Sequence, residues 1–388
     1  MIRHIFQLLW AKRKTNALMM LEIFLAFLVL FASVCFIIFQ LKKLKYPLGF
    51  ETKDHWMVSM DDFYYKDSTE AANQLDQLKN ELKNCPLVES VGSSNSSAPY
   101  LNNTSTTSND NLGFNISTRY AEVDIDFGPA MGIQITSGRW FNEQDHLSKY
   151  PPIIVNELFL KNFFPGKNML DSIIPINGEH RIVGVMKDYR YKGKFDEPAN
   201  MSLLLRRHTE KYLNFILLKM KPGTPLGEQE TINNIVKNVT KSNSFVIKSL
   251  EQEESRNARS RWIPIIALLS ICAFLCINIS LGLFGVLWYN INKRRSEIGL
   301  RRAVGAHTSD ISSQFVLETL GLAVLAILAG ILFAIQVPLL KVIDIDDSIF
   351  YEAIGVVTLI LIMLVLLCAF IPSRQAAAIQ PARALHEE

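Results

Sequence analysis

Four long stretches without a charged residue stand out in the pattern of apolar and polar positions along the chain. A helix rises about 1.5 Å per residue, so about 20 residues of helix cross the hydrocarbon core of a bilayer. Core helices of soluble proteins rarely stay uncharged for so long. The pattern therefore predicts four transmembrane helices, which contain the uncharged stretches 23–39, 263–291, 319–340 and 353–373.

These helices and their flanks divide the chain into consecutive segments. The first helix is too long for a cleaved signal peptide, so we expect it to remain as an anchor. The residues before it fit either a helix on the inner leaflet or an ordinary basic anchor. In order, we predict a cytoplasmic interfacial helix (1–16), transmembrane helix 1 (17–41), an outer domain (42–261), transmembrane helix 2 (263–291), a cytoplasmic elbow (292–312), transmembrane helix 3 (313–340), a short periplasmic loop (341–352), transmembrane helix 4 (353–373) and a cytoplasmic tail (374–388).

The distribution of Lys and Arg predicts the orientation of these helices. Basic residues gather beside the segments assigned to the inner side, whereas the loop 341–352 carries one lysine and several carboxylates. The positive-inside rule therefore places both termini in the cytoplasm and the outer domain outside, in the inner membrane of a bacterium. Lys42, Lys43 and Lys45 oppose this orientation, but one cluster before a long translocated domain carries little weight.

The outer domain mixes strand-like and helix-like patterns, and its two ends repeat the order strand, helix, strand. Two such units commonly pack as a split βαβ sheet with both helices on one face. The predicted fold class is thus membrane α-helical with an α+β extracytoplasmic domain, in which a duplicated βαβ layer carries a β-rich inserted subdomain. The elements are expected at 55–60, 68–85 and 87–91 in the first half (about 50–92), and at 213–220, 226–241 and 245–250 in the second half (about 210–250).

The insertion, about 93–209, begins with an Asn/Ser/Thr-rich stretch at 93–111, whose few apolar positions predict a loop. After the second half, a stalk (251–262) is expected to continue into transmembrane helix 2, with Pro264 as a candidate kink because proline removes a helical hydrogen bond. Cys85 is the only cysteine of the outer domain, which excludes an internal disulfide. Short strands of the insertion are expected at 114–123, 152–155, 173–176 and 181–185.

The sequence contains no arrangement that supports catalysis, a metal or a bound cofactor. A net charge of +3 is too small to indicate a nucleic-acid partner. The turn at 165–168 lacks both the first glycine and the Ser or Thr of a phosphate loop. Cys272 and Cys276 lie one turn apart without a nearby His or carboxylate, so packing is expected there. We therefore expect a non-catalytic membrane protein.

Three polar residues in the predicted membrane helices are of interest. Glu22 and Glu318 lie near the cytoplasmic ends, where a carboxylate can pair with Lys or Arg at low cost. Asn278 is expected to form an interhelical hydrogen bond. Glu318 and Asn278 are therefore assigned structural roles. An ion-coupled transporter is disfavoured, because no helix carries a charged residue near its middle.

The elbow, 292–312, places small apolar residues between its charges, which a plain loop does not require. The chain is expected to turn at Gly305, and Ser309 or Asp310 can cap a new helix. A short helix before the turn would present an apolar edge that suits a groove on a partner, although the pattern also fits a membrane-surface flank. The edge comprises Ile298, Leu300, Ala303, Val304 and Ala306.

Short motifs lie in a definite order around the four predicted helices. They are GRWF (138–141), IVNE (154–157) and IVGVMKD (182–188) in the outer domain, RSEIGLRRAVGA (295–306) with Glu318 behind it, and PSRQAAAIQPA (372–382) in the tail. The last two resemble the permease domain of the FtsX and MacB family of ABC transporters, and the first three are similar to motifs of the MacB-type periplasmic domain. The resemblance covers nearly the whole chain.

The resemblance implies a homodimer, or a pair with a paralogous permease, served by an ABC ATPase on a separate chain that holds ATP and magnesium. In such proteins, closure of the ATPase subunits pushes the cytoplasmic elbow, and transmembrane helix 2 passes the movement to the outer domain, which is mechanotransmission. The residues expected to couple to the ATPase are Arg295, Glu297, Ile298, Gly299, Leu300, Arg301, Arg302, Ala303, Gly305 and Ala306.

Three tasks are open within this family. Efflux of a peptide or drug would require a periplasmic adaptor and an outer-membrane duct, and extraction of a lipoprotein would require a hydrophobic cleft. Activation of a periplasmic hydrolase, as in FtsX-like proteins, would require a docking surface. The stretch 93–111 matches no pattern of the family and is a candidate for partner choice. A membrane sensor that works without ATP is the alternative from another class, and the short predicted tail argues against it.

Overall fold

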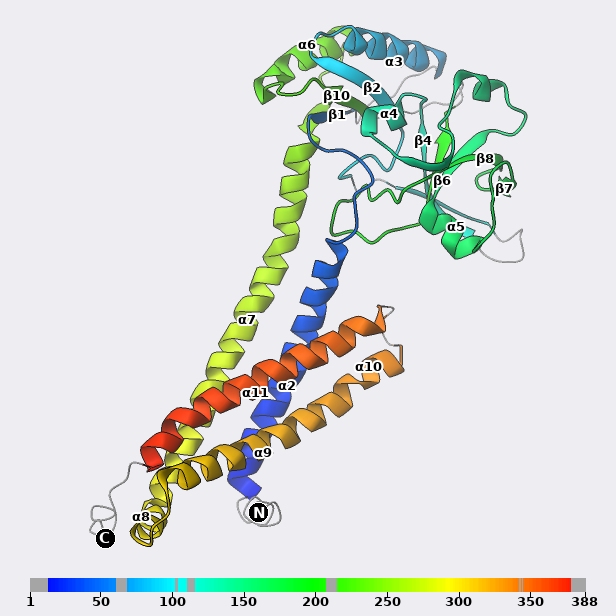
Figure 1. Ribbon diagram of the computed structural model, residues 1–388. Helices are drawn as coiled ribbons and strands as arrows, with labels where there is room; N and C mark the ends of the chain where they lie inside the picture. Colours follow the sequence, from blue (N-terminus) through cyan, green and yellow to red (C-terminus); the bar gives the residue numbers. More distant parts are fainter. Residues whose placement is uncertain are drawn as a thin grey trace. The chain divides into compact units, whose positions relative to one another are not determined.

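The computed structural model describes residues 13–60, 68–101, 104–109, 116–206, 215–341, 343 and 345–377. The chain forms two compact units, a membrane unit of Met1–Lys42 with Ile263–Glu388 and an outer unit of Lys43–Trp262 (Figure 1). Most of the predicted interfacial helix 1–16 and most of the predicted tail 374–388 lie outside the described residues.

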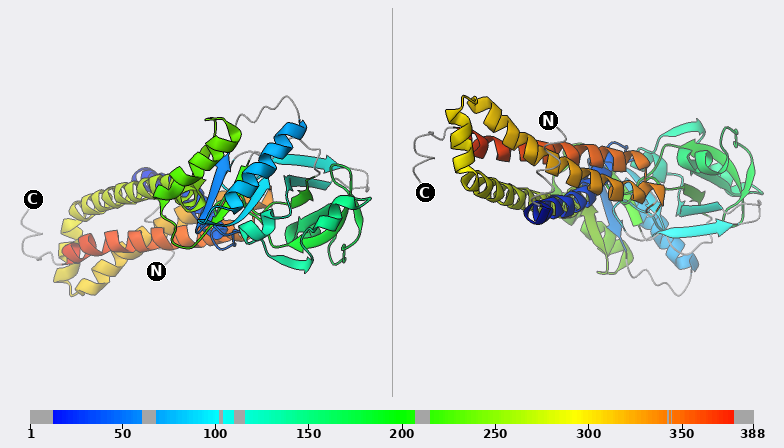
Figure 2. Two further views of the ribbon diagram at one scale, coloured as in Figure 1. Left: turned by 90° about the horizontal axis from the view of Figure 1, so that it is seen from above. Right: turned by 90° about the horizontal axis from the view of Figure 1, so that it is seen from below.

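Four helices of the membrane unit are long and apolar enough to cross a bilayer, as the uncharged stretches predict. Helices α9 and α11 lie side by side (Figures 1 and 2). The prediction of four membrane helices is confirmed. The helices are α2 (Arg13–Lys43), α7 (Leu250–Lys293), α9 (Thr308–Ala334) and α11 (Asp347–Ala377), and the short α10 (Gln336–Leu339) follows α9.

A glycine allows α2 and α9 to approach closely. The Phe27 side chain of α2 is fully buried, and a Cβ atom at Gly330 of α9 would lie 2.4 Å from its ring. The small residues Ala323 and Ala326 of α9 are buried in the same cluster. Small residues commonly let membrane helices pack backbone against side chain in this way.

One expectation for α7 differs from the structure. Asn278 Nδ2 donates to the Phe274 carbonyl at 2.9 Å, one turn back in the same helix, and its side chain is exposed. Among the described residues the predicted interhelical hydrogen bond is not formed, because the helix's own carbonyl is within reach of the amide. The predicted stalk continues through Pro264 into the membrane helix as a single element, and the kink at Pro264 stays a prediction.

One part of the outer unit, built from both ends of its sequence, is the predicted duplicated βαβ layer. Its four strands are all antiparallel to their neighbours, in the order β11 (Val246–Ser249), β1 (His55–Ser59), β10 (Phe215–Met220), β2 (Val88–Ser94). Each half thus has a strand of the other half between its own two strands. Helices α3 (Ser68–Lys83) and α6 (Gln229–Thr240) contact each other and share one apolar cluster with this sheet (Figure 1).

The inserted subdomain continues the same sheet, because Ser94 of β2 pairs with Val123 of β4. Beyond β4 the order is β9, β6, β8, β5, with parallel pairing of β4 to β9 and of β6 to β8. The prediction of a β-rich insertion is confirmed. Its elements are β3 (Ser105–Asn109), β4 (Ile116–Val123), α4 (Phe127–Met131), β5 (Ile135–Gly138), η1 (Glu143–Leu147), β6 (Pro152–Asn156), α5 (Glu157–Phe163), β7 (Ile173–Pro175), β8 (Glu179–Met186) and β9 (Met201–Leu205); η2 (Leu226–Glu228) precedes α6.

The predicted loop at 93–111 is wrong in part, because β3 forms within it. Strand β3 pairs antiparallel with β4 from Ser105 opposite Tyr120 to Asn109 opposite Ile116. Strand pairing joins backbone groups, so a strand at the border of a sheet does not need an apolar face. Residues 102–103 and 110–111 of this stretch lie outside the described residues, as do the first residues of the strands predicted at 114–123 and 213–220.

We expect Gly330→Leu to destabilise the membrane unit, because the new side chain would have to displace the buried Phe27 ring. Overpacking of this kind typically costs about 1–3 kcal/mol. The measurement is the melting temperature of the detergent-solubilised protein. Gly321→Leu in the same helix is the matched control, since a Cβ atom there meets nothing within 4 Å. Equal melting temperatures for the two variants would contradict the close approach of α2 to α9.

We expect Asp145 to stabilise the outer unit in a pH-dependent way. Its carboxylate accepts two hydrogen bonds of 2.7 Å from Arg139 and one of 2.9 Å from the Asn142 N–H. Burial alone would raise the pKa of Asp145, but these donors hold it below its ordinary value. Since the folded pKa lies below the unfolded one, the stabilisation is present above the unfolded pKa of about 3.9 and is lost as the pH falls through the folded pKa.

Asp145→Asn should therefore lower the stability at pH 7 by about 1–2 kcal/mol, because hydrogen bonds to a charged group are lost while Arg139 stays half-exposed. The difference from the wild type should shrink below about pH 4. Thermal unfolding followed by circular dichroism between pH 3 and pH 7 tests this. Glu143→Gln, an exposed carboxyl in the same short helix, is the control, and a pH-independent deficit in Asp145→Asn would refute the assignment.

Candidate functional site

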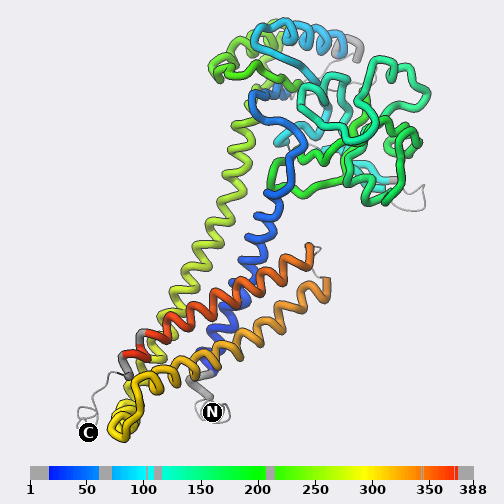
Figure 3. The backbone as a smooth tube through the Cα atoms, viewed as in Figure 1, coloured from blue at the N-terminus to red at the C-terminus, as the bar shows by residue number. Residues whose placement is uncertain are grey.

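The predicted elbow folds as a short helix between two membrane helices. Helix α8 (Arg295–Ala303) follows α7 directly, and the backbone reverses through α8 into α9 (Figure 3). The chain turns at Gly305, whose φ of 102° is a conformation that other residues rarely adopt. Helix α9 begins at Thr308, and Asp310 accepts the N–H of His307 at 3.3 Å from inside its first turn. Asp310 thus caps the helix from its third position rather than from the residue before it.

A small apolar cluster holds α8 against its neighbours. Ile298 is buried against Ile291 of α7 and against Ile311 and Phe315 of α9. An ion pair of 3.2 Å between Arg294 and Glu318 closes one side of this cluster, and both side chains are largely buried. Glu318 also accepts a hydrogen bond of 2.9 Å from Gln314, and the Arg294 guanidinium lies over the Phe315 ring. The position of α8 is therefore fixed from two helices.

The opposite face of α8 is apolar and exposed. Leu300 is 57% exposed and Val304 is 82% exposed. These two residues are four apart, so they share a face, whereas Ile298 and Leu300 are two apart and point about 200° from each other around a helix. The single apolar edge that the sequence suggested is therefore wrong. Ile298 and Ala306 pack inward, and Leu300, Ala303 and Val304 face outward.

The remaining predicted coupling residues surround this exposed face. Glu297 and Arg301 form an ion pair of 2.6 Å along the helix, and Arg301 also donates to Gln314 at 2.9 Å. Arg302 donates to the Ala306 carbonyl at 3.2 Å and closes the turn. Gly299 is buried, Arg295 is half-buried, and Gly305 is exposed.

Glu318 contacts the elbow through Arg294, but Asn278 lies far from it. Asn278 precedes Lys293, the last residue of α7, by 15 residues, which is about 22 Å along the helix. Sequence reasoning missed the inner half of the site, namely Ile291, Ile311 and Phe315. Three of the contacting residues could have been predicted from their helical spacing. Ile311, Phe315 and Glu318 are spaced so that all three lie on one face of α9.

The outer-unit motifs form a packed core rather than an exposed site. Asn156 of IVNE is fully buried, and its side chain donates to Asp188 of IVGVMKD at 2.8 Å while accepting the N–H of Met201 at 2.9 Å. A Cβ atom at Gly184 would lie 2.3 Å from the Arg139 carbonyl oxygen of GRWF. These motifs therefore fix how β5, β6, β8 and β9 meet.

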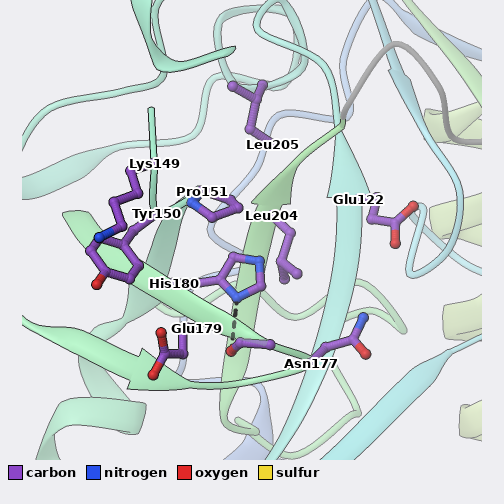
Figure 4. Close-up of a pocket in the computed structure, with 10 residues that line it drawn as sticks. Glu122, Lys149, Tyr150, Pro151, Asn177, Glu179, His180, Leu204 and Leu205 are labelled. Carbon is purple, nitrogen blue, oxygen red and sulfur yellow. Dashed lines mark hydrogen bonds between the residues drawn. The ribbon is translucent and has the colours of Figure 1, made fainter. Parts of the chain in front are cut away.

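A cavity of about 460 Å³ opens beside these strands, at the turn between β7 and β8. Its lining combines carboxylates, a lysine, a histidine and leucines from several elements (Figure 4). His180 bonds through Nδ1 to the Gly178 carbonyl at 3.1 Å, and Lys149 lies over the Tyr150 ring, so these groups already have neighbours within the protein. Within the described ranges, no group of three or more His, Cys, Asp or Glu is placed to hold a metal ion.

Two family models match the chain. The MacB-like periplasmic core domain matches residues 17–230, which is more than half of the chain, and the FtsX-like permease C-terminal model matches residues 265–381. The first model covers α2 and most of the outer unit, and the second covers the rest of the membrane helices and the elbow. Neither model covers residues 231–264, and the second begins close to Ile263, where α7 passes from one unit to the other.

Similar individual proteins carry related descriptions. The macrolide export ATP-binding/permease protein MacB 2 of Aeromonas hydrophila is 25% identical over 293 residues, which is 69% of this chain and 43% of that protein. The probable syringafactin export ATP-binding/permease protein SyfD of Pseudomonas syringae pv. tomato is 24% identical over 300 residues, which is 71% of this chain and 44% of that protein. The chain thus spans less than half the length of these relatives.

Among solved structures, the periplasmic region of MacB from Actinobacillus actinomycetemcomitans is similar with a TM-score of 0.38 and 13% identity, over 55% of this chain and 97% of that one. The extracellular domain of the ABC-type transporter YknZ from Gram-positive bacteria matches with a TM-score of 0.35 and 12% identity, over 50% of this chain and 99% of that one.

Proposed function

Because this chain belongs to the MacB-like family of ABC transporter permeases, we propose that it links ATP hydrolysis on a separate chain to movement of its outer domain. The observation that carries this proposal is the division of α8 into two faces. One face is fixed to α7 and α9 by Ile298 and by the Arg294–Glu318 pair. The other face leaves Leu300 and Val304 exposed. A partner that presses on the second face would therefore move α7 and α9 with it.

A short helix with an exposed apolar stripe suits a groove on a protein partner. Leu300 and Val304 have the spacing of four residues by which helices anchor in such grooves. The Glu297–Arg301 pair beside them offers both charges to a partner, whereas a helix that only rests on lipid typically carries a broader apolar face among cations. These features favour protein docking over the membrane-surface flank.

Helix α7 is the element that would transmit the movement. It is one continuous helix from Leu250, in the outer unit, to Lys293, next to α8. A hydrogen-bonded helix resists bending on either side of a kink site, and Pro264 is the proline inside α7. On the proposed function, a push at α8 would therefore reach the outer unit through α7 by mechanotransmission.

The ATPase and its cofactors would lie on a different polypeptide. The two family models describe a periplasmic core domain and a permease domain, and the relatives named as ATP-binding/permease proteins are more than twice as long as the region they share with this chain. We propose an ABC ATPase that holds ATP and magnesium, with this chain as a homodimer or paired with a paralogous permease. Both termini would be cytoplasmic, with the outer unit in the periplasm.

The transported molecule would be a peptide or drug for export, or a lipoprotein for extraction from the outer face of the membrane. The relatives are described as exporters of macrolides and of syringafactin, which supports the export class without naming the substrate of this chain. Export would engage a periplasmic adaptor and an outer-membrane duct.

Replacing Leu300 and Val304 together by Glu should break the coupling. Two charges would have to be buried without partners in an apolar groove, so we expect loss of co-purification with the ATPase and a fall of at least about ten-fold in the stimulated ATPase rate. The assay uses the full chain in lipid nanodiscs with the ATPase that co-purifies with it. Membrane insertion and melting temperature should match the wild type, because both positions are exposed.

The double change Thr308→Glu, Ser309→Glu is the matched control. It adds the same charge to the elbow at exposed positions in the first turn of α9, where acidic residues are favourable. Binding and stimulation should stay within about two-fold of the wild type for a change of this kind. If the Leu300, Val304 variant also stimulates the ATPase normally, the exposed face of α8 is not the docking site.

A further inference from the structure

The outer unit holds the segment that follows α2 at one internal loop, residues 189–197, which connects β8 to β9. The Arg190 N–H donates to the Leu48 carbonyl at 2.9 Å, and the Arg190 guanidinium donates to the Tyr46 carbonyl at 2.8 Å. Gly49 allows the segment 46–49 to lie this close to the loop, because a Cβ atom at Gly49 would lie 2.0 Å from the Asp188 carbonyl oxygen. Residues 46–49 are thus clamped by main-chain contacts.

The same loop holds the first turns of α7. Asn257 Nδ2 donates to the Lys192 carbonyl at 3.2 Å, and the Phe195 ring meets the Trp262 ring edge-on with centroids 6.0 Å apart. Lys194 forms an ion pair with Glu254, whose other oxygen accepts a hydrogen bond of 2.7 Å from Thr52. Both ends of the outer unit therefore meet at residues 189–197.

Arg190 is the unusual member of this loop. Its side chain is 1% exposed, and in the part of the chain that the structure describes it has no carboxylate at ion-pair distance. Its donors go instead to the main-chain carbonyls of Tyr46, Lys194 and Asp196. A buried cation is costly unless every donor is bonded. Withdrawal of the Tyr46 carbonyl would leave part of that charge unpaired, so the guanidinium resists separation of residues 46–49 from the loop.

The loop is also bonded to the segment that follows β2. The Tyr189 hydroxyl donates to the Ser97 carbonyl at 3.0 Å, and the Tyr100 N–H donates to the Tyr191 carbonyl at 2.6 Å. Its flanking strands carry part of the cavity lining, with His180 on β8 and Leu204 on β9 (Figure 4). A displacement of the loop would therefore act on the strands beside the cavity.

We propose that Arg190 is a positioning residue that makes residues 189–197 the coupling point of the outer unit, joining the segment after α2 to the root of α7. Movement that arrives along α7 is passed by this loop to residues 46–49 and to β8 and β9. The inference rests on the proposed function, because it names where the outer domain receives the movement.

The test compares hydrogen exchange with and without ATP in the full chain, assembled with its ATPase in nanodiscs. In the wild type, residues 44–54 and 250–262 should change their exchange together when ATP binds. In Arg190→Gln, exchange of 44–49 should rise at least about ten-fold and no longer respond to ATP, because these residues lose their clamp. Residues 250–262 should still respond, and so should Thr52, which bonds directly to Glu254 of α7. The ATPase rate should stay within about two-fold, since α8 is unchanged. Arg190→Lys should not restore the response, because an ammonium lacks the planar fork that reaches several carbonyls.

Arg119→Gln is the matched control. Arg119 contacts the Asp196 carboxylate of the same loop at 3.4 Å but is partly exposed and bonds to neither end of the outer unit. It should keep the wild-type pattern. If Arg190→Gln keeps the joint response, or if Arg119→Gln loses it equally, Arg190 has no special coupling role and the inference is overturned.

A second variant covers the case in which Arg190→Gln does not fold. Arg190→Lys keeps a charge at this buried position but lacks the planar fork, so the ATP response should persist in 250–262 and disappear from 44–49. An unchanged joint response would overturn the inference. Failure of the proposed function looks different, because then the wild type itself binds no ATPase or shows no response to ATP in either segment.

Discussion

Backbone hydrogen bonding in lipid is the constraint on which this structure depends. The hydrocarbon core offers no water to N–H and C=O groups, so a segment that crosses it must satisfy them internally. Helix α7 does so in one ladder that extends well past the apolar stretch, from Lys293 back to Leu250. Pro264 removes one donor without ending the helix. The same hydrogen bonds that make the crossing possible therefore also join residues of the elbow to residues of the outer unit in a single element.

A continuous helix can transmit force only if both of its ends are held. The two ends of α7 are held by different kinds of interaction. At the elbow, Ile291 and Ile298 belong to an apolar cluster with a shielded ion pair, Arg294 to Glu318. At the outer end, Glu254 and Asn257 bind a loop through polar contacts. Apolar burial is non-directional and tolerates sliding, whereas hydrogen bonds to fixed carbonyls specify one register. On the proposed function, the apolar contacts of the elbow allow small adjustments to a partner within the limits set by the Arg294–Glu318 pair, while the outer end keeps its geometry.

The sequence predicted what depends on periodicity and missed what depends on tertiary contact. Uncharged stretches identify the membrane helices, and alternating and helical patterns identify the split βαβ layer. Strand β3 was not predicted, because its pairing with β4 needs no apolar face. The single apolar edge predicted for the elbow is wrong, because Ile298 and Leu300 are two residues apart and cannot share one side of a helix. The contacts of Arg190 could not be predicted from the sequence, because its partner Tyr46 is 144 residues away and contributes only a carbonyl oxygen.

The lysines that oppose the predicted orientation also find a physical account in tertiary contacts. Lys42 pairs with Glu352 at 2.7 Å, and Lys43 pairs with Glu197 at 3.1 Å. Such pairs contribute little to stability, but each cancels a positive charge beside the end of α2. At the elbow, Lys293 is exposed and Arg302 bonds only to a carbonyl among its described contacts, so their charge is not cancelled in this way. Arg294 and Arg301 are paired with Glu318 and Glu297, so pairing with carboxylates reduces the positive charge at both ends of the membrane helices, and the predicted orientation rests on the number of basic residues in each segment.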